Sequence, residues 1–155
     1  MTTVCLLGAD DCDLRYELLS RETSREALST YRLNRPFENS VAVETISLGS
    51  AVSLLNDLDW YLVRFAEAAL VLEPSVSGAE WLSRALAEAV REGSVPPEES
   101  GRYLMVYGLE TAEDGAARPV EPMYVTRTGP QLPEYDLREV EETMVVRITE
   151  DEFGG

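Results

Sequence analysis

The stretch that decides the fold is residues 50–73, which read SAVSLLNDLDWYLVRFAEAALVLE. Its apolar residues recur at alternating steps of four and three, a spacing that keeps them on one face of an α-helix. This stripe consists of Ala51, Leu55, Leu58, Leu62, Phe65, Ala69 and Leu72. Pro74 cannot continue a helix, and it disfavours helical backbone in the residue before it. The pattern therefore predicts one long central helix that ends before Pro74.

A further helix is predicted shortly after the central one, from Trp81 to about residue 92. Ser77 and Glu80 have the spacing of a capping box, which marks a helix N-terminus. Gly93 stands where a C-terminal cap glycine is expected, and two prolines follow it closely. Because the link between the two helices is short, we expect them to pack as an antiparallel pair.

Five other stretches have the length and the β-branched or aromatic composition of strands. They are residues 3–7, 41–48, 102–109, 120–128 and 143–149. Between the first two strands, the sequence predicts a helix that follows the acidic residues 10–13 and runs to about Leu33. Its polar middle leaves two alternatives open, one long exposed helix or two short ones.

The expected order is therefore β-α-β-α-α-β-β-β. This order predicts an α+β fold with a single mixed sheet of about five strands and about three helices. We expect the first two strands to be parallel through a right-handed crossover, and the last three to form an antiparallel meander. Residues 1–149 are predicted to form one globular domain, and residues 150–155 a flexible acidic tail. The final Gly154-Gly155 resembles the end of ubiquitin-like modifiers, but those proteins open with a hairpin rather than strand–helix–strand.

Charge is the strongest compositional signal. The 155 residues contain 29 Asp and Glu but only 13 basic residues, so the formal net charge is −16. Such a field repels phosphate backbones and anionic membranes, so we expect no generic nucleic-acid binding and no membrane association. The acids are spread over the whole chain, and the basic residues are all Arg. Surfaces of this kind are typical of proteins that stay soluble at high salt, where charge repulsion is screened.

The absent residue types exclude several kinds of chemistry. Without His there is no Ser-His-Asp triad and no His-ligated zinc. Without Lys there is no Schiff base and no P-loop lysine. Cys5 and Cys12 alone form neither a structural zinc site nor a disulfide framework. The N-terminus has no basic leader segment, and no apolar run is long enough to span a bilayer, so we expect a cytoplasmic protein.

Three carboxylates follow the first predicted strand, namely Asp10, Asp11 and Asp13. Ligands of open α/β sheets bind beyond the carboxyl ends of strands, and carboxylate oxygens are ligands that Mg²⁺ prefers. A magnesium site is therefore one hypothesis for these residues. The alternative is that they cap the following helix and add to an acidic surface.

A second candidate site lies inside the central stretch. Asp57, Asp59, Trp60, Tyr61 and Arg64 follow one another closely, and Trp60 and Arg64 have the four-residue spacing that permits a cation–π contact on a helix. Trp, Tyr and Arg are the residue types enriched in protein–protein hot spots. The alternative is that the two aromatic residues flank the core and Arg64 pairs with nearby acids.

A third candidate consists of Arg102, Arg127 and Arg147, one from each of the last three predicted strands. If those strands are neighbours, the three guanidinium groups could bind an anion through forked hydrogen bonds. The alternative is that each arginine pairs with one of the abundant glutamates across the sheet.

Almost the whole chain resembles a family of small, acidic haloarchaeal proteins of unknown function. The stretches that carry the resemblance include VCLLGADD (4–11), RYELLSRET (15–23), RPFENSVAVETISLGSAVSLLNDLDWYLVRF (35–65), EWLSRAL (80–86), EPMYVTRT (121–128) and PEYDLREVEETMVVRIT (133–149). The resemblance implies an archaeal, cytoplasmic origin. It implies no activity and no site residues.

The sequence favours a binding function, with either a protein partner or a second copy of the chain docking at the residues around Trp60. The alternative is a small enzyme or sensor that uses a divalent ion, such as Mg²⁺, at the Asp residues or an anion at the arginines. The two hypotheses differ in geometry, because docking requires an exposed aromatic patch and catalysis requires a concave site with converging acids.

Overall fold

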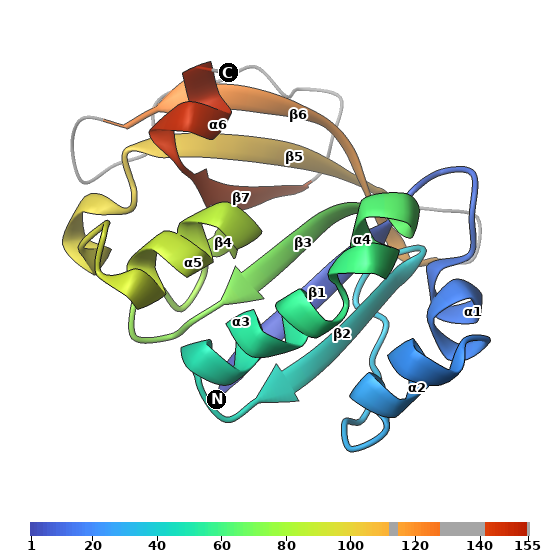
Figure 1. Cartoon of the computed structure of the whole chain (residues 1–155). Helices are drawn as coiled ribbons and strands as arrows, with labels where there is room; N and C mark the ends of the chain where they lie inside the picture. The colour runs from blue at the N-terminus through green and yellow to red at the C-terminus, as the bar shows by residue number, and fades with distance from the viewer. Residues whose placement is uncertain (112–114, 128–141, 155) are drawn as a thin grey trace.

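The computed structural model describes residues 1–111, 115–127 and 142–154. In these residues one sheet of seven strands has the order β2-β1-β3-β4-β7-β5-β6, with helices packed against it (Figure 1). The strands are β1 (Thr2–Gly8), β2 (Ser40–Thr45), β3 (Ala66–Leu72), β4 (Trp81–Ser83), β5 (Tyr103–Thr111), β6 (Ala117–Thr126) and β7 (Glu142–Ile148). The helices are α1 (Leu14–Leu19), α2 (Glu22–Leu28), α3 (Leu48–Asp57), α4 (Asp59–Phe65), α5 (Arg84–Glu92) and α6 (Glu150–Gly154), with a short 3-10 turn at Pro97–Glu99.

The predicted α+β class with a mixed sheet is confirmed, but the predicted numbers of strands and helices are too low. β4 and β7 are parallel, and every other pair of neighbouring strands among the described residues is antiparallel. Between the first two strands the chain forms two short helices, α1 and α2, which is one of the two alternatives that the sequence left open. No helix in the described part of the chain has the length and apolar content needed to cross a bilayer.

The predicted single central helix is wrong in its last third. Helix α3 ends at Asp57, Leu58 separates it from α4, which begins at Asp59, and α4 gives way to strand β3 at Ala66. Strand β3 is sandwiched between β1 and β4, with Leu70 packed on one face of the sheet and Val71 on the other. A short apolar run that is buried on both faces has no period-two alternation, so periodicity alone cannot separate it from a buried helix.

The predicted start of the following helix is also wrong. Trp81–Ser83 form strand β4, and helix α5 begins only at Arg84, with the Ser83 side chain accepting a hydrogen bond from the backbone N–H of Leu86. Ser77 does receive backbone hydrogen bonds, from Ala79 and Glu80, but they close a turn rather than a helix. Gly93 does cap α5, as predicted, in the left-handed conformation at φ 84°.

The predicted parallel pairing of the first two strands is wrong, because β1 and β2 are antiparallel, with Val4 opposite Val43. Strand β3 lies on the other side of β1 and is antiparallel to it as well. β2 and β3 therefore run in the same direction, and helices α3 and α4 form the crossover that connects them (Figure 1). The last three strands are antiparallel, as predicted, but they do not form the predicted meander, because β5 lies between β6 and β7 and pairs with both.

The sheet is curled and has an apolar core on each face. One core lies beneath the helices and contains Leu55 and Leu86 together with Val71 of the sheet. The other lies on the opposite face, where Tyr107 of β5 and Met144 of β7 pack in the same cluster as Leu7 of β1. The curl brings the two edges of the sheet together at one end, since the backbone N–H of Glu38, just before β2, donates to the carbonyl of Ala117 in β6 at 2.7 Å.

Residues 150–154, which the sequence predicts as part of a flexible tail, form helix α6. The Thr149 hydroxyl accepts the backbone N–H of Glu152 at 3.1 Å, and Glu152 Oε1 accepts the N–H of Thr149 at 2.9 Å. This reciprocal pair is a capping box. Glu152 Oε1 also accepts a hydrogen bond from the Ser83 hydroxyl at 2.6 Å, and the ring of Phe153 lies 5.2 Å from that of Tyr103. The C-terminal segment is thus docked on the sheet.

Candidate functional site

Helix α4 carries an exposed apolar patch, which we call the α4 surface and define as Trp60, Val63 and Arg64. The side chain of Trp60 is 51% exposed and that of Val63 is 74% exposed. Tyr61, which the sequence groups with Trp60, is buried in the core beneath the helices, and its ring contacts that of Trp60. The short helix therefore has an inner face that packs and an outer face whose apolar side chains are open to solvent.

Arg64 and its aromatic neighbours hold Trp60 in place. The guanidinium carbon of Arg64 lies 3.7 Å from the centroid of the Trp60 ring, which is the cation–π contact that the spacing predicts. Arg64 Nη1 also donates to the Trp60 carbonyl at 2.8 Å. On its other sides the indole meets Tyr61 and Phe65 edge to face, with centroid distances of 5.0 and 6.4 Å. Trp60 is thus exposed and conformationally restricted at the same time.

The two acids that the sequence groups with Trp60 have other contacts. Asp59 Oδ1 accepts from Arg84 Nη1 at 2.6 Å, which links α4 to α5. Asp57 lies at the end of α3 and lines a small polar groove with Ser53 and Arg91. The structure therefore brings Trp60 and Arg64 together, buries Tyr61, and places neither acid in the stacked group.

Arg127 and Arg147 meet at one carboxylate, that of Glu80, and we call these three residues the arginine cluster. Arg127 makes a bidentate pair with Glu80 through two hydrogen bonds of 2.8 Å, and Arg147 Nε donates to Glu80 Oε1 at 2.7 Å. Their side chains are between 12% and 16% exposed. The hydrogen bonds from Arg127 lower the pKa of Glu80 most, and those from Arg147 add to them against the effect of partial burial.

The loop before β5 supports the arginine cluster. Arg147 Nη1 donates to the hydroxyl of Ser100 at 2.9 Å, and Arg127 Nε donates to the carbonyl of Gly101 at 3.0 Å. A Cβ atom at Gly101 would lie 2.4 Å from Arg127 Nη2, so a larger residue there would displace that guanidinium group. Arg102, the third predicted member, is exposed and lies with its guanidinium carbon 5.4 Å from the centroid of the Tyr103 ring.

The acids after β1 are not gathered for metal binding. Asp13 caps helix α1 by accepting the backbone N–H of Tyr16 at 3.2 Å, whereas Asp10 and Asp11 are exposed in the preceding turn. Within residues 1–111, 115–127 and 142–154, no group of three or more His, Cys, Asp or Glu side chains is placed to hold a metal ion. The geometry of Asp13 is the one that the capping alternative predicts.

The two thiols are not activated. Burial raises the pKa of Cys5 to about 12. Partial burial also raises the pKa of Cys12, and the nearby Asp11, Glu17 and Asp13 raise it further. A thiol is a nucleophile only as the thiolate, so neither cysteine is suited to covalent catalysis at neutral pH.

Sequence reasoning missed two residues that organise these regions. The sequence predicts Glu80 as part of a helix cap, but Glu80 pairs with two arginines that lie 47 and 67 residues away, a pairing that no local spacing reveals. Asn39 holds the loop after β1, because its Nδ2 donates to the carbonyls of Ala9 and Cys12 and its Oδ1 accepts the N–H of Leu14. The position of Asn39 in a turn sequence was the one available signal, and Asn tolerates its φ of 52°.

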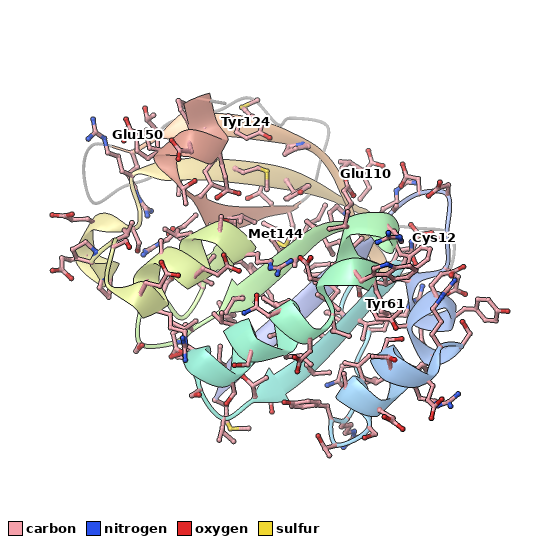
Figure 2. The ribbon with its side chains drawn as sticks, in the orientation of Figure 1. Cys12, Tyr61, Glu110, Tyr124, Met144 and Glu150 are labelled. Carbon is pink, nitrogen blue, oxygen red and sulfur yellow. The ribbon has the colours of Figure 1, made fainter. Side chains whose placement is uncertain are left out.

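The fold and these surfaces define an α+β protein with a curled mixed sheet, an exposed aromatic patch and a buried arginine cluster. The chain belongs to a family of unknown function (DUF5804), whose match spans residues 2–109. That span includes the α4 surface and Glu80 but ends before Arg127 and Arg147. No curated protein and no solved structure matches the chain. Figure 2 shows the labelled Tyr61 of α4 and Glu150 of α6 on opposite sides of the view, so α4 and α6 mark two separate regions.

Proposed function

We propose that this protein acts by binding a protein partner and that the partner docks on the α4 surface. The observation that carries the proposal is the 51% exposure of Trp60, which is held in one orientation by Arg64. Trp is highly buried on average in folded proteins, and Val63 beside it is exposed as well. Exposed apolar groups that adjoin one another are typical of interaction sites. Trp and Arg are also the side chains that contribute most to binding energy at such sites.

The fixed orientation of Trp60 favours binding over incidental exposure. Association ordinarily costs about 0.5–1.5 kcal/mol for each flexible side chain that becomes ordered. The contacts of Trp60 with Arg64, Tyr61 and Phe65 supply that order in the free protein. A partner that covers the indole would therefore gain apolar burial at a reduced entropic cost.

Electrostatics indicates what kind of partner fits. A net charge of −16 disfavours nucleic acid, and in dilute salt it also makes two copies of the chain repel each other, so the partner that we test for is a different protein. Arg64 Nη1 donates to the Trp60 carbonyl. Among the described residues, the Arg64 guanidinium group forms no ion pair. We therefore expect the partner to present an apolar side chain to Trp60 and a carboxylate to Arg64.

The test is site-specific photo-crosslinking in the native host. A photoreactive amino acid replaces Val63, at the centre of the α4 surface. The matched control carries it at Ile46, which is 82% exposed after β2. We expect one dominant protein adduct from position 63 that is absent from position 46 and is lost when Trp60→Ala is added.

Two results would contradict this proposal. One is the same set of adducts from both positions, which would show that position 63 meets proteins at random. The other is an adduct between two copies of the chain, which would assign the α4 surface to self-association.

We also infer that the protein works in the cytoplasm of a salt-accumulating, haloarchaeal cell. The 29 acidic residues against 13 arginines support this setting, because a surface so rich in carboxylates is soluble and compact when salt screens it. The two free cysteines suit a reducing compartment. The dependence of stability on salt, treated below, tests the inference.

A further inference from the structure

A groove of about 1080 Å³ opens beside the arginine cluster. It lies between the segment 94–103 and the ends of β6 and β7, and its lining includes Arg102, Arg127 and Arg147. Binding sites for small molecules are commonly clefts of about 300–1,000 Å³, so the groove is large enough for a ligand rather than a single ion.

The inner end of the groove carries excess positive charge. Arg127 and Arg147 share a single carboxylate, that of Glu80, so two guanidinium groups face one negative charge. Arg147 donates through Nε to Glu80 and through Nη1 to Ser100. Its Nη2 has no hydrogen-bond partner in the described part of the chain. The Arg102 side chain forms no ion pair with any described residue, and its guanidinium carbon lies 5.4 Å from the centroid of the Tyr103 ring.

The outer rim of the same groove is acidic. Glu98 and Glu99 lie in the 3-10 turn, and Glu150 begins helix α6, where Figure 2 labels it. All three side chains line the groove and are exposed. The groove is thus polarised by burial, because the side chains of Arg127 and Arg147 are only 12% and 14% exposed, whereas the three carboxylates and Arg102 are open to solvent.

We propose that this groove binds a small zwitterion, with its carboxylate held by Arg102 and Arg147 and its ammonium group held by the acidic rim. A simple anion satisfies only the inner end and is repelled by Glu98, Glu99 and Glu150. A simple cation pairs only with the carboxylates of the rim and is repelled by the arginines. A ligand with both charges complements the whole groove, and guanidinium forks are well suited to a carboxylate.

The inner end is already built for this role. Glu80 and the carbonyl of Gly101 fix Arg127, and the 3% exposed Ser100 fixes Arg147 while donating to the carbonyl of Pro97 at 2.6 Å. The guanidinium group of Arg147 is therefore oriented before any ligand arrives. Arg102, which is exposed, supplies the adjustable second contact.

The experiment titrates the full chain with aminohexanoate and follows the backbone amide signals of Gly101 and Arg102 by NMR. Hexanoate lacks the ammonium group and hexylammonium lacks the carboxylate, so these two compounds are matched controls for the probe. We expect aminohexanoate, or a shorter member of the same amino-acid series, to bind at least about tenfold more tightly than either control. This ratio corresponds to one charged hydrogen-bonded contact.

Variants locate the two ends of the ligand. Arg102→Gln and Glu150→Gln change exposed side chains, so the fold is retained, and each should weaken binding of the probe by about tenfold. Arg15→Gln changes an exposed arginine of helix α1 and should leave the affinity unchanged.

The proposal is overturned if no member of the series shifts these amides at concentrations up to about 50 mM, well above the 1 mM affinity of a weak ligand. It is also overturned if hexanoate binds as tightly as aminohexanoate, which would leave a simple anion site. Equal effects of Arg102→Gln and Arg15→Gln would contradict it too, because the contact would then be nonspecific.

Discussion

Glu80 determines the charge balance of the arginine cluster. The substitution Glu80→Gln removes the negative charge and leaves two largely buried guanidinium groups without a carboxylate. This change should lower the free energy of unfolding by about 2 kcal/mol near neutral pH. Chemical denaturation of both proteins in concentrated KCl measures this difference.

The pH dependence identifies the ionised form of Glu80 as the cause. Its pKa is lower in the folded protein than the ordinary value of 4.5, so its contribution is present above that value and is lost as the pH falls through the folded pKa. We therefore expect the stability difference between the wild type and Glu80→Gln to be constant from pH 6 to 8 and to narrow below about pH 4.5. A difference that does not change down to pH 3 would show that Glu80 is not held as a carboxylate by the arginines.

Gly101 makes room for Arg127. In Gly101→Ala the new Cβ atom would lie 2.4 Å from Arg127 Nη2, so the guanidinium group must move away from Glu80. Because Nη2 is the far end of a flexible side chain, we expect a cost at the lower end of the range for overpacking, about 1 kcal/mol. The matched control is Gly78→Ala, because a Cβ atom there meets nothing within 4 Å. We expect thermal denaturation to show a clear loss of stability for the first variant only, and equal melting temperatures would contradict the packing.

At the scale of elements, helix α6 tests whether the C-terminal segment belongs to the fold. Phe153 packs against Tyr103 and Tyr124, with centroid distances of 5.2 and 6.5 Å. Phe153→Ala should therefore lower the free energy of unfolding by about 2 kcal/mol, somewhat less than for a fully buried ring.

The control for this prediction is Asp151→Ala, an exposed position in the same helix, which should change stability by no more than about 0.5 kcal/mol. Urea denaturation compares the two variants under one set of conditions. If both behave like the wild type, α6 contributes nothing to the folded state and the segment is a tail, as the sequence predicts.

The sequence predicts five of the seven strands found in the described residues, because these stretches are rich in β-branched and aromatic residues between turn signals. Strands β3 and β4 were missed for a physical reason. Residues 66–72 are Ala and Leu-rich and continue the helical spacing of α4, but pairing with β1 on one side and β4 on the other overrides that local preference. Trp81–Ser83 are too few to show any period, and their parallel pairing with β7 is entirely non-local.

The candidate sites differ in the same way, because local spacing predicts some of their contacts and only the tertiary fold creates the others. The stacking of Arg64 on Trp60 was predictable because both residues lie four apart on one helix. The sequence named Arg127 and Arg147 together on the condition that the last three strands are neighbours, and in the structure their strands lie on either side of β5. Their shared partner Glu80 comes from the turn before β4, and only the tertiary fold brings it there.

At the scale of the whole molecule, the net charge of −16 should make stability depend on salt. Repulsion between exposed carboxylates destabilises the compact state, and ions screen it over a Debye length that falls to about 3 Å at 1 M. We expect the melting temperature to rise as KCl increases from the millimolar to the molar range.

A charge-reduced variant separates this repulsion from general salt effects. Asp10, Asp11, Glu22 and Glu44 are exposed, and their replacement by the corresponding amides removes four negative charges. The melting temperature of that variant should respond less steeply to KCl than that of the wild type. Parallel curves for the two proteins would show that carboxylate repulsion is not what salt relieves.

In the proposed function, the exposed and stacked Trp60 is the main contact for a protein partner. The most direct measurement is the affinity of the purified partner, identified by crosslinking, for the wild type, Trp60→Ala and Tyr16→Ala. Tyr16 is the matched control, since it is a 66% exposed aromatic residue on helix α1. We predict that Trp60→Ala weakens binding by at least about 30-fold, the effect of a hot-spot residue, and that Tyr16→Ala leaves it unchanged. Equal affinities for the wild type and Trp60→Ala would contradict the account.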